Sequence, residues 1–540
     1  MPSSVLVGVT AYAALGGFVF GFDLGVIAGV LPSMTRDLSL DHVEAELVVG
    51  GCKVGAALGA LAAVFLLRPL GHRCCFSLSG AAYVGGPVLM ALADTWWLMA
   101  LGRGLTGVGI GLSAVAAPAY LGEVAPPSVR GAVVGAYELL LCVGLLVAAA
   151  LNYVLLDTPL QLSTPLLPGW RLPLCAPGAL GACVLLGAPC LPPSPATMVR
   201  AGRYDDAFDL LVRLAGGRAD GLPAAATRVS SLSRFSSTRT TPLEGSSAAA
   251  PRGARSRHVA ALDEAQRLFD ALLAQAERSA ARAPVSIRRL VCGRERRAGL
   301  LMFCLAVVNQ ANGSSTLLNY ISDVIGAAGA PPEAAAVVSI AVAAAKLLAV
   351  AVALRLIDAI GRRPLLLAGA LGSAAALGAL ATAISAGSLA ATIAALAAFM
   401  LVYAVSLAPI FFVLLSELFS DDAKPLAAGL ATALTFAAGA VVDSFFLSLV
   451  DAIGHSGALG LLAAVCLVGG AAVLWMLPET KGKSLLEVQR LMAPRRAPPA
   501  QPLRPSASAS EEEEAAEEDE NEETRRMLVR RRSSPWILAA

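Results

Sequence analysis

The sequence predicts an all-helical membrane protein with twelve transmembrane helices, arranged as two halves of six helices each. The first observation is the composition: 56% of the residues are hydrophobic and only 15% are charged. Soluble chains have about 45–50% apolar and about 25% charged residues. The second is that the apolar residues fall in blocks of about 20, the length of one bilayer crossing. The third is that these blocks form two sets, separated by one long polar segment.

The first six spans are expected near residues 5–31, 47–67, 75–92, 96–118, 131–155 and 173–191. The second six are expected near residues 299–321, 334–356, 364–386, 391–416, 426–450 and 457–477. The first block is too long for the apolar part of a signal peptide and no basic residues precede it, so we interpret it as a span. Two halves of this kind are typical of transporters with a substrate site between the halves.

The chain is expected to have four parts: an N-terminal six-helix half (1–192), a cytosolic linker (193–297), a C-terminal six-helix half (298–490) and a disordered cytosolic tail (491–540). Within the linker, apolar residues recur at helical spacing in 203–216 and 259–279, which predicts two short helices. The Arg- and Ser-rich stretch 217–258 contains few large apolar residues, so it is expected to be disordered.

Positive charges indicate which side of the membrane faces the cytosol. The short loops 32–46, 321–333 and 451–456 contain Arg36 as their only Arg or Lys. The opposite side carries many more basic residues, namely Arg68, Arg73, Arg130, Arg362, Arg363 and those of the linker. Because Arg and Lys near span ends favour the cytosol, both termini and the linker are expected there. The plasma membrane is the expected location rather than an internal membrane.

The sequence pattern argues against several other kinds of site. The cysteines fall mostly in apolar blocks or expected cytosolic segments, without the spacing of a disulfide framework. The histidines are far apart, so no metal site is expected. The GVGIG stretch, residues 107–111, lies inside a span and follows no strand, so it indicates close helix packing rather than phosphate binding. We therefore expect no metal, no cofactor and no enzymatic site, and the net charge of +2 gives no sign of a nucleic-acid partner.

Six ionisable residues lie inside the expected spans, where each costs about 2.5–3.5 kcal/mol near the bilayer centre. They are Asp23, Lys53, Arg103, Glu138, Lys346 and Asp443. This cost makes them functional candidates. Lys53 lies close enough to a span end for its ammonium to reach the interface, which favours a structural role. Asp443 lies deeper and has no evident partner, so structural and cavity-lining roles both stay open.

Asp23 in the first span and Arg103 in the fourth are opposite charges within the same half. If the two side chains face one cavity, Arg103 favours the ionised carboxylate and burial favours the neutral one. A carboxyl balanced in this way can take up and release a proton, as proton coupling requires. The alternative is a static buried ion pair that holds helices together.

Six sequence motifs follow one another along the chain. They are GFDLGVIAG (21–29), GRGLTGVGIGL (102–112), YLGEVAPPSVRG (120–131), DAIGRR (358–363), LLSELF (414–419) and LPETKGKSL (477–485). Together they resemble the motifs of the sugar-porter branch of the major facilitator superfamily over about residues 5–490. The resemblance implies a secondary transporter that moves a hexose or related sugar by alternating access, with proton symport. A facilitative uniporter and a non-transporting sugar sensor remain alternatives.

The resemblance also implies which residues form the sites. Substrate-binding positions of the family correspond here to Glu138, Asn309, Gln310, Ser315, Lys346 and Phe412. Charged residues that gate the cavity from the cytosolic side correspond to Glu123, Arg130, Asp358, Arg362, Arg363, Glu417 and Glu479. Glu138 and Lys346 together resemble glucose-transporter types ten and twelve, although they could also form a structural pair. Phe412 replaces a tryptophan and Gly439 an asparagine of the family, which leaves the sugar undetermined.

Overall fold

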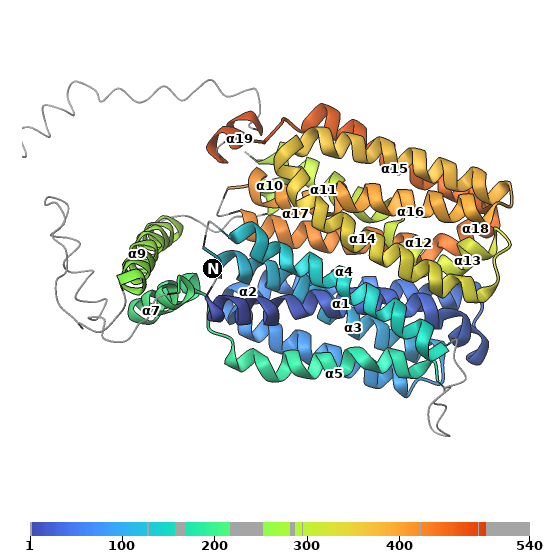
Figure 1. The fold of residues 1–540 in the computed structure, drawn as a ribbon, viewed down its shortest axis with the longest axis horizontal. Helices are drawn as coiled ribbons and strands as arrows, with labels where there is room; N and C mark the ends of the chain where they lie inside the picture. The colour runs from blue at the N-terminus through green and yellow to red at the C-terminus, as the bar shows by residue number, and fades with distance from the viewer. Residues whose placement is uncertain are drawn as a thin grey trace, which may run out of the picture. The chain divides into compact units, whose positions relative to one another are not determined.

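The computed structural model describes residues 3–126, 129–156, 169–216, 252–280, 287–293, 295–420, 423–483 and 485–492. Within these ranges the regular structure is entirely helical. The helices of the two expected halves lie side by side, with α1 to α5 in one set and α11 to α18 in the other (Figure 1). The expectation of an all-helical fold is confirmed.

The N-terminal half contains α1 (Ser4–Asp37), α2 (His42–Ala91), α3 (Trp96–Val124), α4 (Arg130–Leu156) and α5 (Arg171–Gly187). Helix α2 holds two spans, because the chain turns at Gly71, where φ is 75° and only glycine is unstrained. A capping box starts this helix, since the Asp41 carboxylate accepts from the Glu44 N–H and the Glu44 carboxylate accepts from the Asp41 N–H. Five helices therefore provide the six expected spans.

The C-terminal half contains α11 (Arg296–Ala311), α12 (Ser314–Asn319), α13 (Ile321–Gly326), α14 (Pro332–Ile360), α15 (Arg362–Ser385), α16 (Leu389–Val405), α17 (Leu407–Leu418) and α18 (Lys424–Met476). The seventh span is broken into α11, α12 and α13, and the tenth is interrupted at Ser406 between α16 and α17. Helix α18 holds two spans that join at Gly454. In the described part of the chain, nine helices are long and apolar enough to cross a membrane. Two of these contain two spans each, and the broken seventh span completes the twelve.

The segment between the halves contains α6 (Pro195–Arg200), α7 (Tyr204–Leu214), α9 (Arg252–Ala280) and α10 (Ile287–Val291), and α19 (Leu485–Met492) follows the last span. Helices α7 and α9 correspond to the two predicted short helices and pack through an edge-to-face contact of Phe208 with Phe269. Helix α9 starts inside the stretch 217–258 that was expected to be disordered. Alanine and arginine there are strong helix formers, which composition-based reasoning about disorder overlooks. Residues 217–251 and the tail 493–540 lie outside the described residues.

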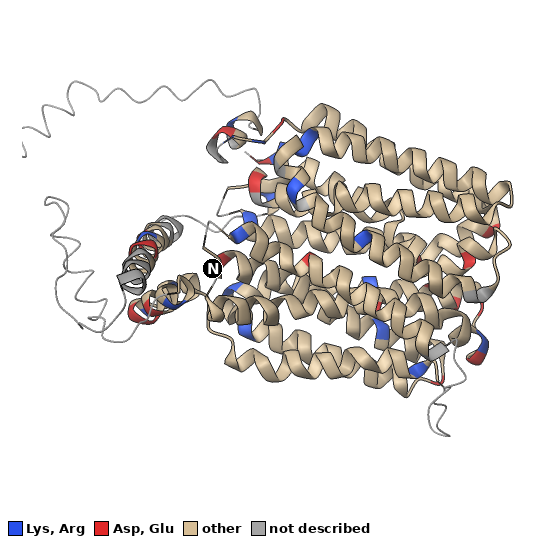
Figure 2. Ribbon diagram, in the orientation of Figure 1, with Lys and Arg blue, Asp and Glu red and all other residues tan. Residues whose placement is uncertain are grey.

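Charged residues gather at the two ends of the transmembrane helices, and a few lie in the apolar middle (Figure 2). We call the end where the chain turns at Gly71 and Gly361 the inner end, and the end where it turns at Gly454 the outer end. An apolar core cluster near the outer end contains residues of both halves, among them Ile27 of α1 and Leu317 of α12. Two further clusters near the inner end belong mainly to one half each. The halves are therefore packed together most extensively at the outer end.

Glycines of the GVGIG stretch lie where α3 packs against α2. A Cβ atom at Gly111 would collide with the backbone carbonyl oxygen of Ala56. This close approach supports the interpretation that small residues allow membrane helices to pack tightly.

Gly111→Ala is expected to destabilise the protein by about 1–3 kcal/mol, because the added methyl group forces α2 and α3 apart. The measurement is the thermal unfolding midpoint of the purified protein in detergent. Gly122→Ala on the same helix is the matched control, since a Cβ there meets nothing within 4 Å. The control should be neutral or stabilising, as expected for glycine replaced by alanine in a helix. Equal midpoints for the two variants would contradict the close packing.

Candidate functional site

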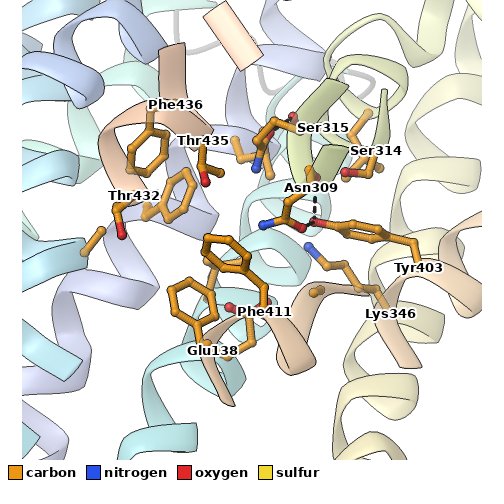
Figure 3. Close-up of a pocket in the computed structure, with 18 of the residues that line it drawn as sticks. Glu138, Asn309, Ser314, Ser315, Lys346, Tyr403, Phe411, Thr432, Thr435 and Phe436 are labelled. Carbon is orange, nitrogen blue, oxygen red and sulfur yellow. Dashed lines mark hydrogen bonds between the residues drawn. The ribbon is translucent and has the colours of Figure 1, made fainter. Parts of the chain in front are cut away.

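A cavity of about 70 Å³ lies between the two halves. One buried water needs about 10–15 Å³, so the space holds several waters or part of a small polar solute. Side chains from α1, α2, α3 and α4 line it on one side and those from α11, α12, α14, α16, α17 and α18 on the other. All six residues predicted to bind substrate line this cavity, namely Glu138, Asn309, Gln310, Ser315, Lys346 and Phe412. Several of them are seen together in Figure 3.

The break in the seventh span places three of these residues at the cavity. Gly313 adopts a left-handed conformation with φ 81°, and the Asn312 side chain accepts a hydrogen bond of 2.8 Å from the Ser314 N–H. Asn309 and Gln310 lie in the last turn of α11 on one side of this break, and Ser315 is the second residue of α12 on the other. The Ser315 hydroxyl donates to Gln310 Oε1 over 2.7 Å. The broken helix thus turns polar side chains inward without exposing them to lipid.

Asn309 is held by a neighbouring helix. The Tyr403 hydroxyl of α16 donates to Asn309 Oδ1 over 3.2 Å, as the dashed line in Figure 3 shows. Because Tyr403 engages the amide oxygen, the Asn309 NH₂ group is left to face the cavity and to donate to a ligand.

Glu138 on α4 and Lys346 on α14 bring opposite charges to the cavity from opposite halves. The side chains of Glu138, Asn309 and Lys346 converge on the same space in Figure 3. Lys346 is only 6% exposed. Over the described ranges, Glu138 and Lys346 form neither an ion pair with each other nor a hydrogen bond with another side chain. The two charges therefore remain available to a ligand, which argues against the structural pair that the sequence left open.

Asp23 and Arg103 form a buried ion pair inside the N-terminal half. Arg103 Nη1 lies 2.5 Å from Asp23 Oδ1, and the Cys52 thiol donates to Asp23 Oδ2 over 3.2 Å. Asp23 and Arg103 are 3% and 2% exposed, and neither side chain lines the cavity. The structure brings the pair together outside the cavity lining, to which the same helix contributes Phe20 and Leu24.

A second buried ion pair was not foreseen. Lys53 Nζ on α2 lies 2.8 Å from Asp443 Oδ2 on α18, and the two side chains are 8% and 1% exposed. The interpretation of Lys53 as a residue that reaches the membrane interface is wrong, because its ammonium points into the protein toward this carboxylate. Asp443 also has the partner that the sequence did not reveal. One available signal was depth: Lys53 lies eleven residues after His42 and Asp443 eleven residues before Gly454, so both lie equally far from the outer end.

Four of the predicted gate residues form a cluster at the inner end of the C-terminal half. Arg362 Nη2 pairs with Glu417 Oε1 at 2.9 Å, which joins α15 to α17. The Glu479 carboxylate accepts from the N–H groups of Arg362 and Arg363 over 3.2 and 3.1 Å, at the N-terminus of α15. The Arg363 guanidinium donates to the carbonyl oxygen of Leu474. These contacts join elements of one half.

The other predicted gate residues take no part in this cluster. Arg130 donates to the carbonyl oxygen of Ala125 over 3.4 Å, in the loop before α4. Glu123 has a buried carboxylate oxygen for which the described residues supply no hydrogen-bond donor. The side chain of Asp358 lies outside what the structure describes. A lock of opposite charges between the halves at the inner end therefore stays a prediction.

The Glu479 carboxylate gives this cluster a pH dependence. Burial raises the pKa of Glu479, but the backbone N–H groups of Lys481, Arg362, Arg363 and Thr480 lower it more, so that the pKa is below its ordinary value of 4.5. Ionised Glu479 thus stabilises the folded state above this ordinary value, and the contribution is lost as the pH falls through the lower folded value.

Glu479→Gln is expected to lower the stability at neutral pH by about 1 kcal/mol, a charge-assisted hydrogen-bond contribution reduced by exposure to water. The measurement is the thermal midpoint of variant and parent between neutral and acidic pH. The difference between the two proteins should shrink as the pH falls below 4.5. A difference that stays constant with pH would show that the ionised carboxylate is not responsible.

Comparisons with known proteins place these features in a family. The profile of the family described as "Sugar (and other) transporter" matches residues 9–243 and 244–492. The galactose-proton symporter of Escherichia coli (strain K12) is 28% identical over 484 residues, which cover 88% of this chain and 92% of that protein. The D-xylose-proton symporter-like 2 protein of Arabidopsis thaliana is 26% identical over 488 residues, covering 88% and 89%.

Solved structures share the fold. The proton:xylose symporter XylE bound to 6-bromo-6-deoxy-D-glucose superposes with a TM-score of 0.69 at 21% identity, over 91% of this chain and 99% of that chain. An inward open conformation of XylE from E. coli gives a TM-score of 0.67 at 19% identity, over 90% and 99%. The family profile covers most of the chain, and the helices have the arrangement of these transporters. The chain therefore belongs to the sugar transporter family, and it is an integral, multi-pass membrane protein with the fold of the major facilitator superfamily.

Proposed function

We propose that this protein is a secondary transporter that moves a hexose or related sugar by alternating access, with proton symport. The observation that carries this proposal is the cavity between the halves, into which amide, hydroxyl, charged and aromatic groups from both halves point. Relatives described as galactose-proton and xylose-proton symporters support the substrate class. A site between two halves can open to either side as the halves rock, which is the basis of alternating access.

The polar groups of the cavity match the chemistry of a polyol, since each hydroxyl of a sugar both donates and accepts hydrogen bonds. The Glu138 carboxylate accepts from hydroxyl groups, and the Lys346 ammonium donates to them. Asn309 and Gln310 add amide groups, and Phe412 offers an apolar surface to a sugar ring. We infer from Glu138 and Lys346 that the chain is nearest to glucose-transporter types ten and twelve among the sugar porters.

Asp23 is the proposed site of proton coupling. Protonation would neutralise its carboxylate and weaken the attraction to Arg103, which lies 2.5 Å away. Because α1 carries both Asp23 and the cavity residues Phe20 and Leu24, a change in the packing of α1 against α3 reaches the cavity wall. Proton binding at Asp23 and sugar binding in the cavity would then be coupled through α1, although the two ligands bind at different sites.

The charge pattern supports further parts of the proposal. We place both termini and the inner end on the cytosolic side, and the protein in the plasma membrane. We also retain the division into halves 1–192 and 298–490, with a cytosolic linker 193–297 and tail 491–540. The gate at the inner end would use Glu123, Arg130, Asp358, Arg362, Arg363, Glu417 and Glu479. The protein is proposed not to be an enzyme, and neither a metal nor a cofactor is needed for transport of this kind.

A facilitative uniporter is the second candidate, and one observation favours it. Asp23 and Arg103 are tightly paired and do not line the cavity, as is expected of a static structural pair.

One experiment separates the two candidates and tests transport itself. Uptake of a panel of labelled hexoses, pentoses and polyols is measured in proteoliposomes, with and without a pH gradient. Symport predicts accumulation that requires the gradient, together with alkalinisation of the medium when sugar is added. Sugar uptake that only equilibrates would indicate the uniporter, and an absence of uptake for the whole panel would reject the proposed function.

A further inference from the structure

A row of polar contacts joins α2 of one half to α18 of the other near the outer end. His42 Nδ1 lies 2.8 Å from Asp451 Oδ2. Four residues further along α2, the Glu46 carboxylate accepts from the N–H and the hydroxyl of Ser448, over 2.9 and 2.6 Å. Seven residues further still, Lys53 pairs with Asp443. Spacings of four and seven place these side chains on one face of α2.

In the innermost contact of this row, Lys53 and Asp443 differ in how far they depend on partners from the opposite half. Asp443 accepts hydrogen bonds from Thr316 and Asn319, both of its own half, in addition to its ion pair with Lys53. Lys53 binds Asp443 and Ser315, and both of these partners lie in the other half. If α2 and α18 separate, Asp443 keeps two donors, whereas Lys53 loses both of its partners within the described chain. The ion pair and hydrogen bond of Lys53 therefore stabilise the state in which the outer end is closed.

Lys53 also contacts the proposed transport site. Its ammonium lines the cavity and donates over 2.5 Å to the Ser315 hydroxyl, which in turn donates to Gln310 Oε1. The absence of a side chain at Gly439 makes this possible. A Cβ there would lie 2.8 Å from Lys53 Cδ and 3.2 Å from Gln310 Oε1. Lys53 thus occupies the space that a larger residue at position 439 would fill.

We propose that Lys53 ties the substrate cavity to closure of the outer end. Its ammonium bridges α2 to α18 through Asp443 only while the outer end is closed, and it reaches the ligand-binding amide of Gln310 through Ser315. The inference rests on the alternating access of the proposed function, but not on the identity of the sugar or on proton coupling.

The unequal partners predict an order of effects. Asp443→Asn leaves a buried ammonium without its counter-charge, and the closed state loses most, because removing one member of a buried pair costs far more than removing both. Lys53→Met removes the bridge, while the Asp443 carboxylate keeps its hydrogen bonds to Thr316 and Asn319. The double variant Lys53→Met with Asp443→Asn contains no buried charge at this place. Its balance between the closed and the open outer end should therefore return toward that of the parent.

The test measures the outer-end distance in the full-length protein in lipid nanodiscs. Spin labels are placed at Val43 and Ile453, exposed residues at the outer ends of α2 and α18, after serine replaces the exposed native Cys183, Cys190 and Cys292. Asp443→Asn should raise the ratio of long to short distances by roughly tenfold or more. Lys53→Met should raise it less, and the double variant should fall below the Asp443→Asn value.

Thr435→Val is the matched control, because Thr435 lies on α18 at the cavity and its hydroxyl bonds to Ala431 of the same helix. The control should keep the distances of the parent. If Asp443→Asn does not fold, Gly439→Ala provides a second variant, since the methyl group pushes against Lys53 and should shift the distances in the same direction. Unchanged distances in Asp443→Asn or Gly439→Ala, or a double variant shifted as far as Asp443→Asn, would overturn the proposal. Because the measurement needs no substrate, a shift without sugar uptake would reject sugar transport alone.

Discussion

Asp23→Asn is expected to abolish accumulation of sugar against its gradient, while exchange of labelled for unlabelled sugar continues. Asparagine keeps the shape of the side chain but cannot bind and release a proton. A gradient of one pH unit is worth about 1.4 kcal/mol per proton, so coupling of one proton to one sugar supports about tenfold accumulation. In proteoliposomes with such a gradient, the ratio of internal to external sugar should fall to about one for the variant. This is the ratio expected when no proton is coupled to sugar transport.

Cys52→Ser provides the matched control for this result. The Cys52 thiol donates to the same carboxylate over 3.2 Å, and serine retains a donor without changing the charge of the pair. This control should accumulate sugar like the parent. Accumulation by Asp23→Asn at the level of the parent would identify the Asp23–Arg103 pair as a static structural contact and would move the site of proton coupling elsewhere.

Lys346→Met should raise the KM for sugar uptake by about tenfold to a hundredfold. Hydrogen bonds to charged groups contribute about 1.5–3 kcal/mol, and the loss is in this range when no other donor replaces the ammonium. Lys346 is 6% exposed, lines the cavity and forms no ion pair among the described residues, so a bound hydroxyl is the partner that it lacks. The measurement is the concentration dependence of initial uptake rates in proteoliposomes.

Two further variants complete this test. Ser339→Ala on the same helix removes a hydroxyl that bonds to Ala335 away from the cavity, and it should leave KM unchanged. Glu138→Gln combined with Lys346→Asn replaces both charges by amides, which themselves bind hydroxyls, and should recover part of the affinity. A KM for Lys346→Met equal to that of the parent would exclude Lys346 from the substrate site.

The polar contacts at the two ends of the transmembrane helices differ in whether they cross between the halves. At the inner end, Arg362 and Glu417 join elements of one half. At the outer end, Glu46 and Lys53 of α2 bind Ser448 and Asp443 of α18, across the boundary between the halves. These polar contacts between the halves therefore have to break when the outer end opens. The difference in free energy between Lys53 in its buried ion pair and Lys53 in water contributes to the free energy of that opening.

The membrane class, the twelve spans and several of the cavity residues follow from the amino-acid sequence alone. Hydropathy is a local property, so blocks of bilayer length can be located without knowledge of their neighbours. A charge inside such a block is costly wherever the block lies, which marks six residues as candidates: Asp23, Lys53, Arg103, Glu138, Lys346 and Asp443. The turns at Gly71 and Gly454 fall in the gaps between expected spans, whereas the break at Gly313 lies inside the expected seventh span and was not foreseen.

Which of these charges meet depends on the folded arrangement of the helices. Lys53 and Asp443 are separated by 390 positions, and their pairing depends on how α2 and α18 are rotated about their axes and how closely they approach. The rotation of α1 likewise keeps Asp23 out of the cavity lining, and the rotations of α4 and α14 turn Glu138 and Lys346 toward the cavity without pairing them. Rotation and approach follow from packing with neighbouring helices, including the space left by Gly439, and the sequence of one span does not contain that information.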